Sequence, residues 1–413
     1  IKIKKIKKKK KRKVFKRKES EREKMVEFFI AFRHIVERKF QSIFSTLGIA
    51  IAVTVFIVSL TVSNGLGRNM INSLLTMSPH ILIKHKKKNF FENYGEVVEN
   101  LKKVEGVKAV IPKINSQSII KSQGFARGVL AYGIMPDNVK NDLDLRMIAG
   151  NNNVEELNSI LVGEELAKGM GLKVGQEISL VSAENNEIKL IVRGIFKTGF
   201  LEYDTNLAIV PMKTMQISAD QGEVATDIWV KTINPQKVEN VEKKIISNNV
   251  IPHSEYGILD WKMLNQSLLN AVRFEKFVLI AILSLLLLIA SFAVSVILNM
   301  VVREKIKDIG ILKSIGYTNK NIRRIFMIEG LLLGFFGMIM GSILSPIVLF
   351  VLKILFKVFM KNGTYYLEEL PLYISQKELL IIYGVTFAVV FLSTIFPAAR
   401  AARLKPVEAL KYE

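Results

Sequence analysis

Four long stretches of the chain are apolar and contain no charged residue. A helix needs about 20 such residues to cross a bilayer, and each stretch reaches that length. One stretch alone could be a buried helix of a soluble protein. Four together favour a membrane protein, in which the spans must be helices because hydrocarbon cannot satisfy backbone polar groups. The predicted spans are Phe40–Gly67, Phe277–Val302, Gly330–Leu352 and Leu379–Ala399.

A different pattern fills residues 68–272, between the first two spans. Short segments of alternating character, separated by turn residues, predict one extracytoplasmic α+β domain, and two lobes remain an open variant. Residues 187–190 alternate as in a half-buried strand, and Asn185-Asn186 predicts the preceding hairpin turn. The predicted strands are His80–Lys84, Val107–Ile111, Gly128–Ile134, Glu177–Ser182, Glu187–Phe196, Asn206–Val210 and Asp227–Lys231, and the predicted helices are Tyr94–Val104, Val162–Met170 and Asn234–Ser247.

Helical spacing also appears ahead of the first span, where large apolar residues recur every three or four positions. This pattern predicts an interfacial amphipathic helix over residues 25–39; the alternative is a cytoplasmic extension of the first span. The apolar side carries Phe28, Phe32, Ile35, Val36 and Phe40, and the polar side carries Glu27, Arg33, His34, Glu37 and Arg38.

The third predicted span carries a row of small residues. The steps of four, three and four residues place Gly330, Gly334, Gly337 and Gly341 on one helical face. Small residues let membrane helices approach closely. We therefore expect this face to pack against another helix of the same chain or of a partner, the alternative being glycine as ordinary membrane composition.

The net charge of +22 invites a nucleic-acid interpretation, but its distribution argues against one. Ile1–Lys18 holds 13 Lys/Arg and no acidic residue, so one tail carries more than half of the excess. Such a tail favours an anionic membrane surface, which contributes about 1 kcal/mol per Lys/Arg; a solvated charge run is the alternative. We expect no nucleic-acid partner.

Positive charge also predicts the orientation of the spans. Lys/Arg residues are concentrated in the N-terminal tail, in residues 303–324 and in the C-terminal tail, so we expect these three segments to be cytoplasmic and the inserted domain to be periplasmic. The first span is expected to act as an uncleaved signal anchor. The predicted division is a basic tail (1–24), an interfacial helix (25–39), a first span (40–67), the α+β domain (68–272), a second span (273–302), a cytoplasmic helix (303–317), a third span (318–357), a short periplasmic loop (358–377), a fourth span (378–399) and a cytoplasmic tail (400–413).

Candidate chemistry is sparse. The chain has no cysteine, its four histidines are scattered, and no Gly-Lys-Ser/Thr of a phosphate-binding loop occurs. We therefore predict no catalytic residue, metal site or bound cofactor, and the uncharged spans argue against an ion path. Glu202 and Asp204 could mimic a site, but a solvated turn is the favoured interpretation.

The cytoplasmic segment after the second span has its own amphipathic pattern. Four aliphatic residues, Ile306, Ile309, Leu312 and Ile315, fall near one helical face, while Lys305, Asp308 and Lys313 fall away from it. Gly316 can end this helix in the left-handed conformation, and Thr318 can cap the next one. The pattern alone leaves two interpretations open: a helix that transmits a push from a soluble partner, or a plain interfacial helix.

A resemblance to a known family covers residues 28–413. REKIKDIGILKSIGYTNKNIRRIFMIEG, with its continuation to Gly341, and FPAARAARLKPVEALKYE resemble the FtsX-like permeases, which are ABC transporters that work by mechanotransmission. Other segments are similar to the lipoprotein-releasing permeases of the LolC/LolE family, whose inserted domain is MacB-like. These segments are FFIAFRHI, STLGIAIAVTVFIVSLTVSNG, SPHI, GIFKTGFLEYDTNLAIVP and DWKMLNQSLLNAVRFEKFVLIAIL.

The resemblance implies a non-enzymatic permease subunit that extracts acylated lipoproteins from the outer leaflet of the bacterial inner membrane. Its implied partners are a LolD-like ATPase that binds ATP and magnesium, a second permease copy or paralogue, and a periplasmic lipoprotein carrier. The implied ATPase-coupling residues are Lys305, Ile306, Asp308, Ile309, Leu312, Ile315 and Gly316. The implied lipid-facing residues are Val62, Leu66, Met70, Phe274 and Phe277.

One departure concerns the carrier. In one subunit of the two-permease systems, a long hairpin reaches the carrier, whereas residues 180–189 here predict a tight hairpin. Two alternative functions stay open: a MacB-like efflux permease for peptides or drugs, and an FtsX-like regulator that relays ATPase strokes to an outside enzyme. Lipoprotein retention in the inner membrane after depletion of this chain distinguishes the three.

Overall fold

The computed structural model describes residues 24–92, 94–182, 185–218, 222–252, 254–360 and 369–405. The chain divides into two compact units. The helical unit comprises Ile1–Leu66, Arg273–Lys361 and Glu369–Glu413, and the β-rich unit comprises Gly67–Val272 with Asn362–Glu368. Most of the expected basic tail, residues 361–368 of the expected short loop and residues 406–413 lie outside the described residues.

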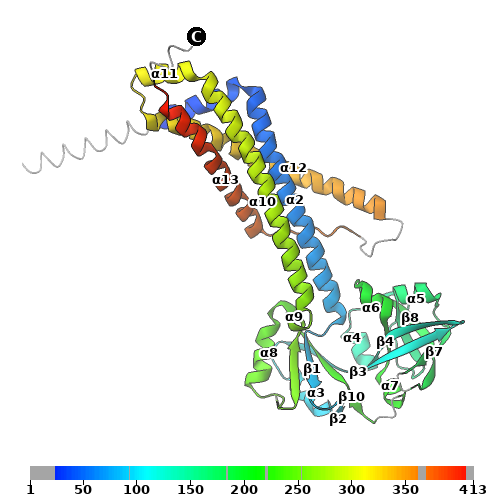
Figure 1. The fold of residues 1–413 in the computed structure, drawn as a ribbon. Helices are drawn as coiled ribbons and strands as arrows, with labels where there is room; N and C mark the ends of the chain where they lie inside the picture. The colour runs from blue at the N-terminus through cyan, green and yellow to red at the C-terminus, as the bar shows by residue number, and fades with distance from the viewer. Residues whose placement is uncertain are drawn as a thin grey trace, which may run out of the picture. The chain divides into compact units, whose positions relative to one another are not determined.

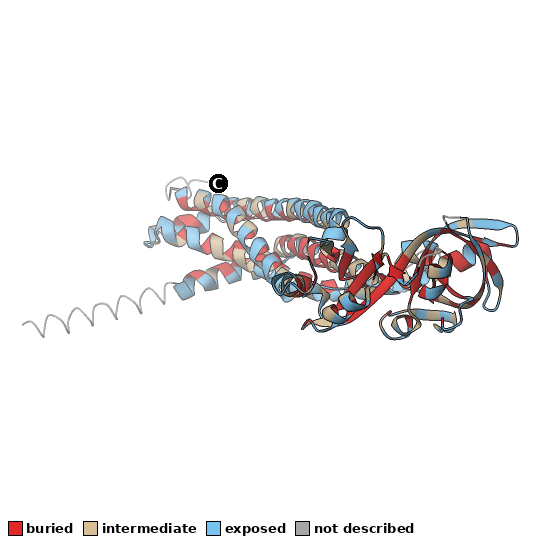
Figure 2. Cartoon of the chain, turned by 90° about the horizontal axis from the view of Figure 1, so that it is seen from below, coloured by how far each residue is buried: buried red, intermediate tan, exposed pale blue. Residues whose placement is uncertain are grey.

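Four helices in the described chain are long and apolar enough to cross a membrane, by length and composition (Figure 1). Each contains one of the four stretches predicted from the sequence and extends beyond it. The helices are α2 (Lys39–Met77), α10 (Gln266–Glu304), α12 (Asn319–Met360) and α13 (Gln376–Arg403). Many of their residues are exposed, and these are coloured pale blue on the cartoon in Figure 2. On a membrane helix such residues meet lipid or a partner helix.

The glycine row of α12 lies where neighbouring helices of the same chain approach most closely. A Cβ atom added to Gly334 would lie 2.7 Å from Val390 Cγ1 of α13. One added to Gly341 would lie 2.7 Å from the backbone oxygen of Ala50 on α2. The other two glycines of the row make corresponding approaches to α13 and α2. The row therefore packs within this chain, because larger side chains would hold the helices apart.

Two short helices accompany the long ones. Helix α1 spans residues 24–37 and is separated from α2 by a turn at Arg38. Helix α11 (Ile306–Ser314) lies between α10 and α12 in the sequence. Its C-terminal end is followed by Gly316 with φ +105°, the left-handed conformation expected for this glycine.

A ten-stranded sheet forms the core of the β-rich unit, in the order β12-β1-β11-β3-β4-β9-β6-β8-β5, and β7 pairs with both β3 and β8. The pairings β3–β4–β9–β6–β8–β7–β3 close a ring, so these six strands form a barrel. Strand β3 (Val107–Ser122) pairs with β11 near its start and with β7 near its end. The unit therefore has two lobes, an open sheet and a barrel, that share β3.

The remaining elements of the sheet are short, and a separate pair is formed by β2 (Phe91–Glu92) and β10 (Val224–Ala225). The other strands are β1 (Ile81–His85), β4 (Phe125–Ile134), β5 (Arg146–Gly150), β6 (Ser159–Gly163), β7 (Glu177–Val181), β8 (Glu187–Lys197), β9 (Leu207–Pro211), β11 (Asp227–Thr232) and β12 (Tyr256–Asp260). The helical segments are α3 (Tyr94–Lys102), α4 (Pro136–Asn141), α5 (Glu164–Met170), α6 (Leu201–Asn206), α7 (Met212–Ser218), η1 (Pro235–Lys237), α8 (Val238–Ser247) and α9 (Trp261–Leu264).

The seven predicted strands are present, but three strands of the sheet (β5, β6 and β12) were not predicted. All five residues of β6 are buried, so this strand lacks the alternation by which a half-buried strand is detected. The predicted helix Val162–Met170 ran into it. The observed helix α5 begins at Glu164, because Val162 and Gly163 complete β6.

A buried lysine lies where the open sheet meets the barrel. The Nζ atom of Lys113 is 3.5 Å from Asp227 Oδ2, 3.6 Å from the ring centroid of Tyr132 and 4.2 Å from that of Trp229. The Asn115 side chain hydrogen-bonds to both Lys113 and Asp227. Burial lowers the pKa of Lys113 to about 7, although the Asp227 carboxylate opposes this shift.

This depressed pKa predicts that the β-rich unit is more stable at pH 9 than at pH 7. An unfolded lysine keeps its proton up to about pH 10.4, whereas folded Lys113 loses it near pH 7. Between these values the unfolded state binds more protons, so the free energy of unfolding rises with pH, here by about 1–2 kcal/mol. The free energy of unfolding at each pH is measured by urea unfolding of the detergent-solubilised chain.

Tryptophan fluorescence reports this transition, since both tryptophans, Trp229 and Trp261, are buried in the β-rich unit. A double variant with Lys113→Met and Asp227→Asn removes both charges and should reduce the rise to the share contributed by Lys231, whose pKa burial also lowers to about 7. Equal unfolding free energies of the unmodified chain at pH 7 and pH 9 would contradict the prediction.

Candidate coupling site at α11

Helix α11 rests on an apolar cluster built by several helices. Ile309 is only 2% exposed and belongs to one buried cluster with Val302 of α10, Phe326 of α12 and Ala401 of α13. Ala31 of α1 joins the same cluster. Leu312 is half-buried against the same cluster, and Ile306 is half-buried at the start of the helix. One side of α11 is thus part of the packing of the helical unit.

The opposite side of α11 carries exposed aliphatic residues. Ile311 is 53% exposed and Ile315 is 70% exposed, and Lys307 and Asp308 are exposed beside them. Large aliphatic side chains that remain exposed at a helix end mark a contact surface when they occur together. We call Lys307, Asp308, Ile311 and Ile315 the α11 outer face.

The expected coupling residues are therefore divided between the two sides. Ile309 cannot touch a partner directly, because the helical unit itself covers it. Ile315 leaves the aliphatic stripe because α11 ends at Ser314 and Ile315 is its C-terminal capping residue. Ile311, which the sequence pattern did not single out, joins the exposed side. Only the three-dimensional packing distinguishes these positions.

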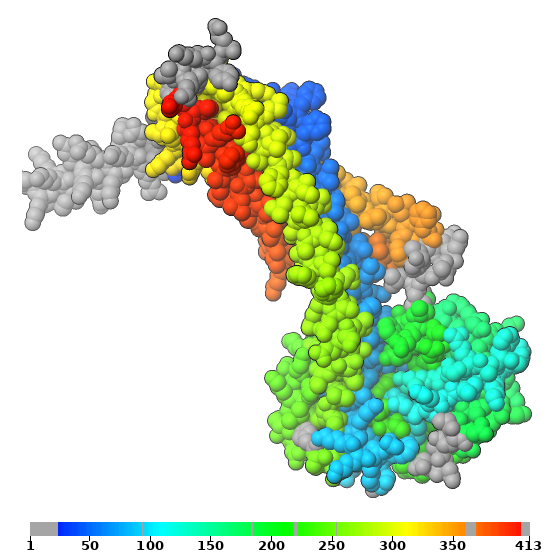
Figure 3. Space-filling model, viewed as in Figure 1, coloured from blue at the N-terminus to red at the C-terminus, as the bar shows by residue number. Residues whose placement is uncertain are grey.

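Polar contacts hold both ends of α11. Lys305 Nζ lies 2.9 Å from Asp308 Oδ2 and 3.3 Å from Glu37 Oε2 of α1, and these carboxylates raise the pKa of Lys305. At the other end, Lys313 Nζ donates to the backbone oxygens of Ala402 (2.7 Å) and Leu404 (2.5 Å). A cation at a helix C-terminus is favourable. In Figure 3 the yellow surface of α11 lies beside the red end of α13.

Helix α1 is attached to the same region through its polar side. His34 Nδ1 lies 3.3 Å from Glu329 Oε2 of α12, with both residues buried. Asn321 Nδ2 of α12 donates to Glu27 Oε1 over 2.8 Å. Arg38, which follows α1, pairs with Glu304 at the end of α10. The apolar side of α1 stays exposed through Phe28, Phe29, Phe32 and Val36.

The expected lipid-facing residues are on both units. Val62 and Leu66 on α2 and Phe274 and Phe277 on α10 lie in the helical unit, whereas Met70 lies in the β-rich unit. The two phenylalanines are each 68% exposed, Leu66 is exposed, and Val62 and Met70 are half-buried. Further exposed apolar residues continue along α10: Val278, Ile282, Leu285, Ile289, Phe292 and Val296.

A polar bracket joins three helices of the helical unit next to Phe277. Lys276 Nζ of α10 donates to Asn64 Oδ1 of α2 (2.9 Å) and to Glu378 Oε1 of α13 (2.5 Å). Asn64 Nδ2 donates to Glu378 Oε2 over 2.9 Å, which closes a triangle. The sequence did not reveal this bracket, because its members are more than 100 positions apart and border three different spans.

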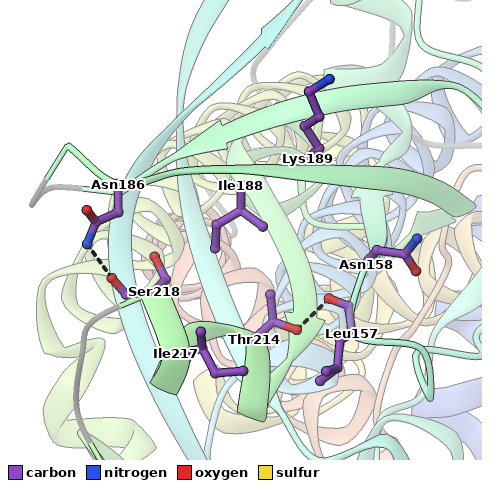
Figure 4. A pocket seen from close by; sticks show the side chains of 8 residues that line it. All are labelled: Leu157, Asn158, Asn186, Ile188, Lys189, Thr214, Ile217 and Ser218. Carbon is purple, nitrogen blue, oxygen red and sulfur yellow. Dashed lines mark hydrogen bonds between the residues drawn. The ribbon is translucent and has the colours of Figure 1, made fainter.

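The β-rich unit contains a pocket of about 580 Å³ beside the β7–β8 hairpin (Figure 4). The hairpin is short, as predicted: Ser182 N donates to Asn186 O over 3.0 Å, and residues 183–184 lie outside the described chain. Amide, hydroxyl and aliphatic groups line the pocket, with Lys189 as its charged residue, so it offers no acid–base pair. The lining residues are Leu157, Asn158, Asn186, Ile188, Lys189, Thr214, Ile217 and Ser218.

The two carboxylates considered earlier differ from each other. Glu202 is exposed, as expected for a solvated turn. Asp204 is fully buried, so the turn interpretation is wrong for it. Its carboxylate accepts hydrogen bonds from Thr198 N (2.7 Å), Thr198 Oγ1 (2.8 Å) and Gly199 N (3.2 Å). Asp204 therefore shapes the loop before α6, although burial raises its pKa.

Within the described ranges, no group of three or more histidine and carboxylate side chains is arranged to hold a metal ion. The arrangement at α11 supports mechanical coupling, because one side is built into the helical unit and the other is open to a partner.

Comparison with known proteins identifies both halves of the chain. A family model described as the MacB-like periplasmic core domain matches residues 42–248, half of the chain. The chain belongs to this MacB-like family. A second model, described as FtsX-like permease C-terminal, matches residues 280–406 and so includes α11. The MacB-like and FtsX-like resemblances found in the sequence are thereby confirmed.

Curated relatives extend the same likeness over most of the chain. The lipoprotein-releasing system transmembrane protein LolC of Neisseria meningitidis is 27% identical over 94% of this chain and 99% of its own length. LolE of Haemophilus influenzae is 23% identical over 89% of this chain and 93% of its own length. A crystal structure of the periplasmic region of MacB from Actinobacillus actinomycetemcomitans covers 49% of this chain and 98% of that one, with 13% identity and a TM-score of 0.33.

The attachment of α1 can be tested by reversing one ion pair. Arg38→Glu should place two carboxylates side by side and loosen α1, so amide hydrogen exchange in residues 24–37 should become faster. Adding Glu304→Arg restores opposite charges and should recover most of the protection, because the pair is partly buried.

Arg33→Ala is the matched control on the same helix, since Arg33 is 71% exposed and forms only a surface pair with Glu37. Such pairs contribute about 0–1 kcal/mol. Equal exchange in the single and the doubly reversed variants would contradict the proposed attachment.

Proposed function

We propose that this chain is a permease subunit of an ABC transporter that extracts acylated lipoproteins from the outer leaflet of the bacterial inner membrane and releases them toward the outer membrane. The observation that carries the proposal is similarity to a lipoprotein-releasing transmembrane protein over 94% of the chain. This similarity includes both the MacB-like region and the FtsX-like region.

In the proposed topology, α2, α10, α12 and α13 cross the membrane and the β-rich unit is periplasmic. Both termini and α11 are cytoplasmic. The support is the concentration of Lys/Arg in the N-terminal tail, in residues 303–324 and in the C-terminal tail, because such residues are retained on the cytoplasmic side.

The proposed contact with a separate, LolD-like ATPase is the α11 outer face. That partner would bind ATP and magnesium, since this sequence contains no Gly-Lys-Ser/Thr. A force on Ile311 and Ile315 would reach α10 and α12 through buried Ile309, and α13 through Lys313. The role assigned to Ile309 is therefore transmission, whereas direct contact belongs to its exposed neighbours.

The proposed lipid path is the exposed apolar side of α2 and α10 in the helical unit. A second permease subunit, identical or homologous, would face it and enclose the acyl chains. Each buried CH₂ group contributes about 0.8 kcal/mol, so an apolar wall formed by Leu66, Phe274 and Phe277 suits this cargo.

Docking of a soluble lipoprotein carrier is assigned away from the β7–β8 hairpin. A five-residue turn region, Ser182–Asn186, is too short to reach far from the barrel. A carrier, where one exists, would meet the second permease subunit.

Depletion of this chain in its native bacterium tests the proposed function. Lipoproteins destined for the outer membrane should accumulate in the inner membrane, as measured by density-gradient fractionation and immunoblotting. Normal lipoprotein distribution together with increased sensitivity to drugs or peptides would instead favour the efflux function. Normal distribution with an impaired cell-wall hydrolase would favour a regulator.

The α11 outer face generates a second test. Ile311→Asp combined with Ile315→Asp should weaken ATPase binding and reduce lipoprotein release at least tenfold, while the permease still folds because both side chains are exposed. Ile309→Asp should unfold the helical unit, since it buries a charge in an apolar cluster.

Ile233→Asp is the matched control, because Ile233 in the β-rich unit is 72% exposed, close to the 70% of Ile315. It should leave ATPase binding unchanged. Co-purification with the ATPase and release from proteoliposomes are the measurements. Normal ATPase binding by the Ile311/Ile315 double variant would show that the contact lies elsewhere.

A further inference from the structure

A buried lysine of the β-rich unit forms hydrogen bonds with the C-terminal end of α2. The last carbonyls of a helix have no partner within the helix. Lys231 Nζ donates to the backbone oxygens of Leu75 (2.8 Å), Thr76 (3.0 Å) and Ser78 (2.8 Å). Lys231 lies on β11 and is 6% exposed. The Lys231 amino group thus fixes the end of α2 to the sheet. Burial lowers the pKa of Lys231 to about 7, whereas the three carbonyl acceptors favour its protonated form.

A second contact comes from the sequence motif before β9. Tyr203 on α6 places its hydroxyl 2.8 Å from Ser78 Oγ, directly after the end of α2. Asp204 fixes the preceding loop through Thr198 and Gly199, as described above. A Cβ added to Gly199 would lie only 3.0 Å from the Oγ atom of Ser73 on α2. The loop therefore lies directly against this helix.

A third contact continues into β1. His80 Nδ1 accepts a hydrogen bond from Thr232 N over 2.8 Å, and its backbone oxygen accepts one from Trp261 N over 3.0 Å. Because Nδ1 is an acceptor, the imidazole is neutral, and burial lowers the pKa of His80 to about 3. The residues after α2 are thus tied to β11 and to α9, which precedes α10.

The stability of the fold does not by itself require a lysine at position 231. Burying an ammonium group is costly, and aliphatic residues often replace buried charges without loss of stability. What an aliphatic residue cannot do is hold three carbonyls of a helix end in fixed positions. These three directional hydrogen bonds resist displacement of the helix end along its axis, whereas non-directional apolar contacts allow the helix to shift.

We infer that Lys231 and Tyr203 form a mechanical joint that transmits movement of α2 to the periplasmic β-rich unit during lipoprotein release. Both are positioning residues: neither touches cargo or nucleotide. The inference rests on the proposed function and assigns a role to the GFLEYDT segment. Asp204 supports the joint by shaping the loop that carries Tyr203.

The experiment uses the complete transporter, purified with its ATPase and second permease subunit and reconstituted in proteoliposomes with a fluorescently labelled triacylated lipoprotein. The measured quantity is lipoprotein released per ATP hydrolysed. Tyr203→Phe removes only the hydroxyl that meets Ser78, and Ser78→Ala removes the other half of the same hydrogen bond.

Each single variant should lower release per ATP about threefold to tenfold, with ATP hydrolysis and the unfolding midpoint of tryptophan fluorescence unchanged. The double variant should resemble the single ones, because both remove the same contact. Lys231→Met should have the largest effect. Tyr256→Phe is the matched control: the ring of Tyr256 stacks on Phe91 in the same unit, and phenylalanine keeps that ring.

Different outcomes would overturn the joint and the proposed function. No release by the unmodified transporter would overturn the proposed function itself. Normal release by the unmodified transporter, with unchanged release per ATP in the Tyr203→Phe, Ser78→Ala and Lys231→Met variants, would overturn the joint. A loss that only parallels a lower unfolding midpoint would show a structural role and would also overturn it.

Discussion

Hydrocarbon offers no hydrogen bonds, so every polar group along a bundle of long apolar helices must find its partner within the protein. The helical unit follows this constraint. Its apolar middle is held by close packing along the glycine row of α12 and by hydroxyl hydrogen bonds such as that between Ser342 and Tyr383. Lysine contacts join the helices near α11 and at the bracket of Lys276. Close packing brings the helices together, and the lysine contacts link them near their ends.

Two lysines bind the free carbonyl oxygens at the C-terminal ends of two different helices. Lys313 donates to carbonyls at the C-terminal end of α13, and Lys231 does so at the C-terminal end of α2. In both cases the charge complements the helix dipole and satisfies oxygens that the helix leaves free. The proposed ATPase contact at α11 and the proposed joint in the β-rich unit therefore both depend on a lysine bound to the carbonyl oxygens of a helix end.

Much of this organisation follows from the sequence pattern, and the failures have physical causes. Long uncharged runs predict the four helices, and period-two alternation predicts strands such as β8, because burial on one side leaves a periodic signal. The fully buried β6 lacks this alternation and runs directly into α5, so the sequence pattern assigns its last residues to that helix. Asp227, which pairs with Lys113, and the helix end bound by Lys231 come from distant segments, so local pattern could not find them. Asp204 bonds to nearby Thr198 and Gly199, but its burial depends on the packing of the whole unit. The same limit explains Ile309 and Ile311: amphipathic spacing shows that α11 has two sides, but only packing decides which residues a partner can reach.

The closed barrel has a practical consequence at its short hairpin. Strand β7 pairs with β3 as well as with β8, so its register is fixed on both sides up to Val181. The turn between Ser182 and Asn185 can then be lengthened without shifting the strands, and doubling a loop costs only about 0.6 kcal/mol. This turn is therefore a suitable graft point, either for a longer hairpin from a related permease or for a rigid fiducial protein in electron cryo-microscopy.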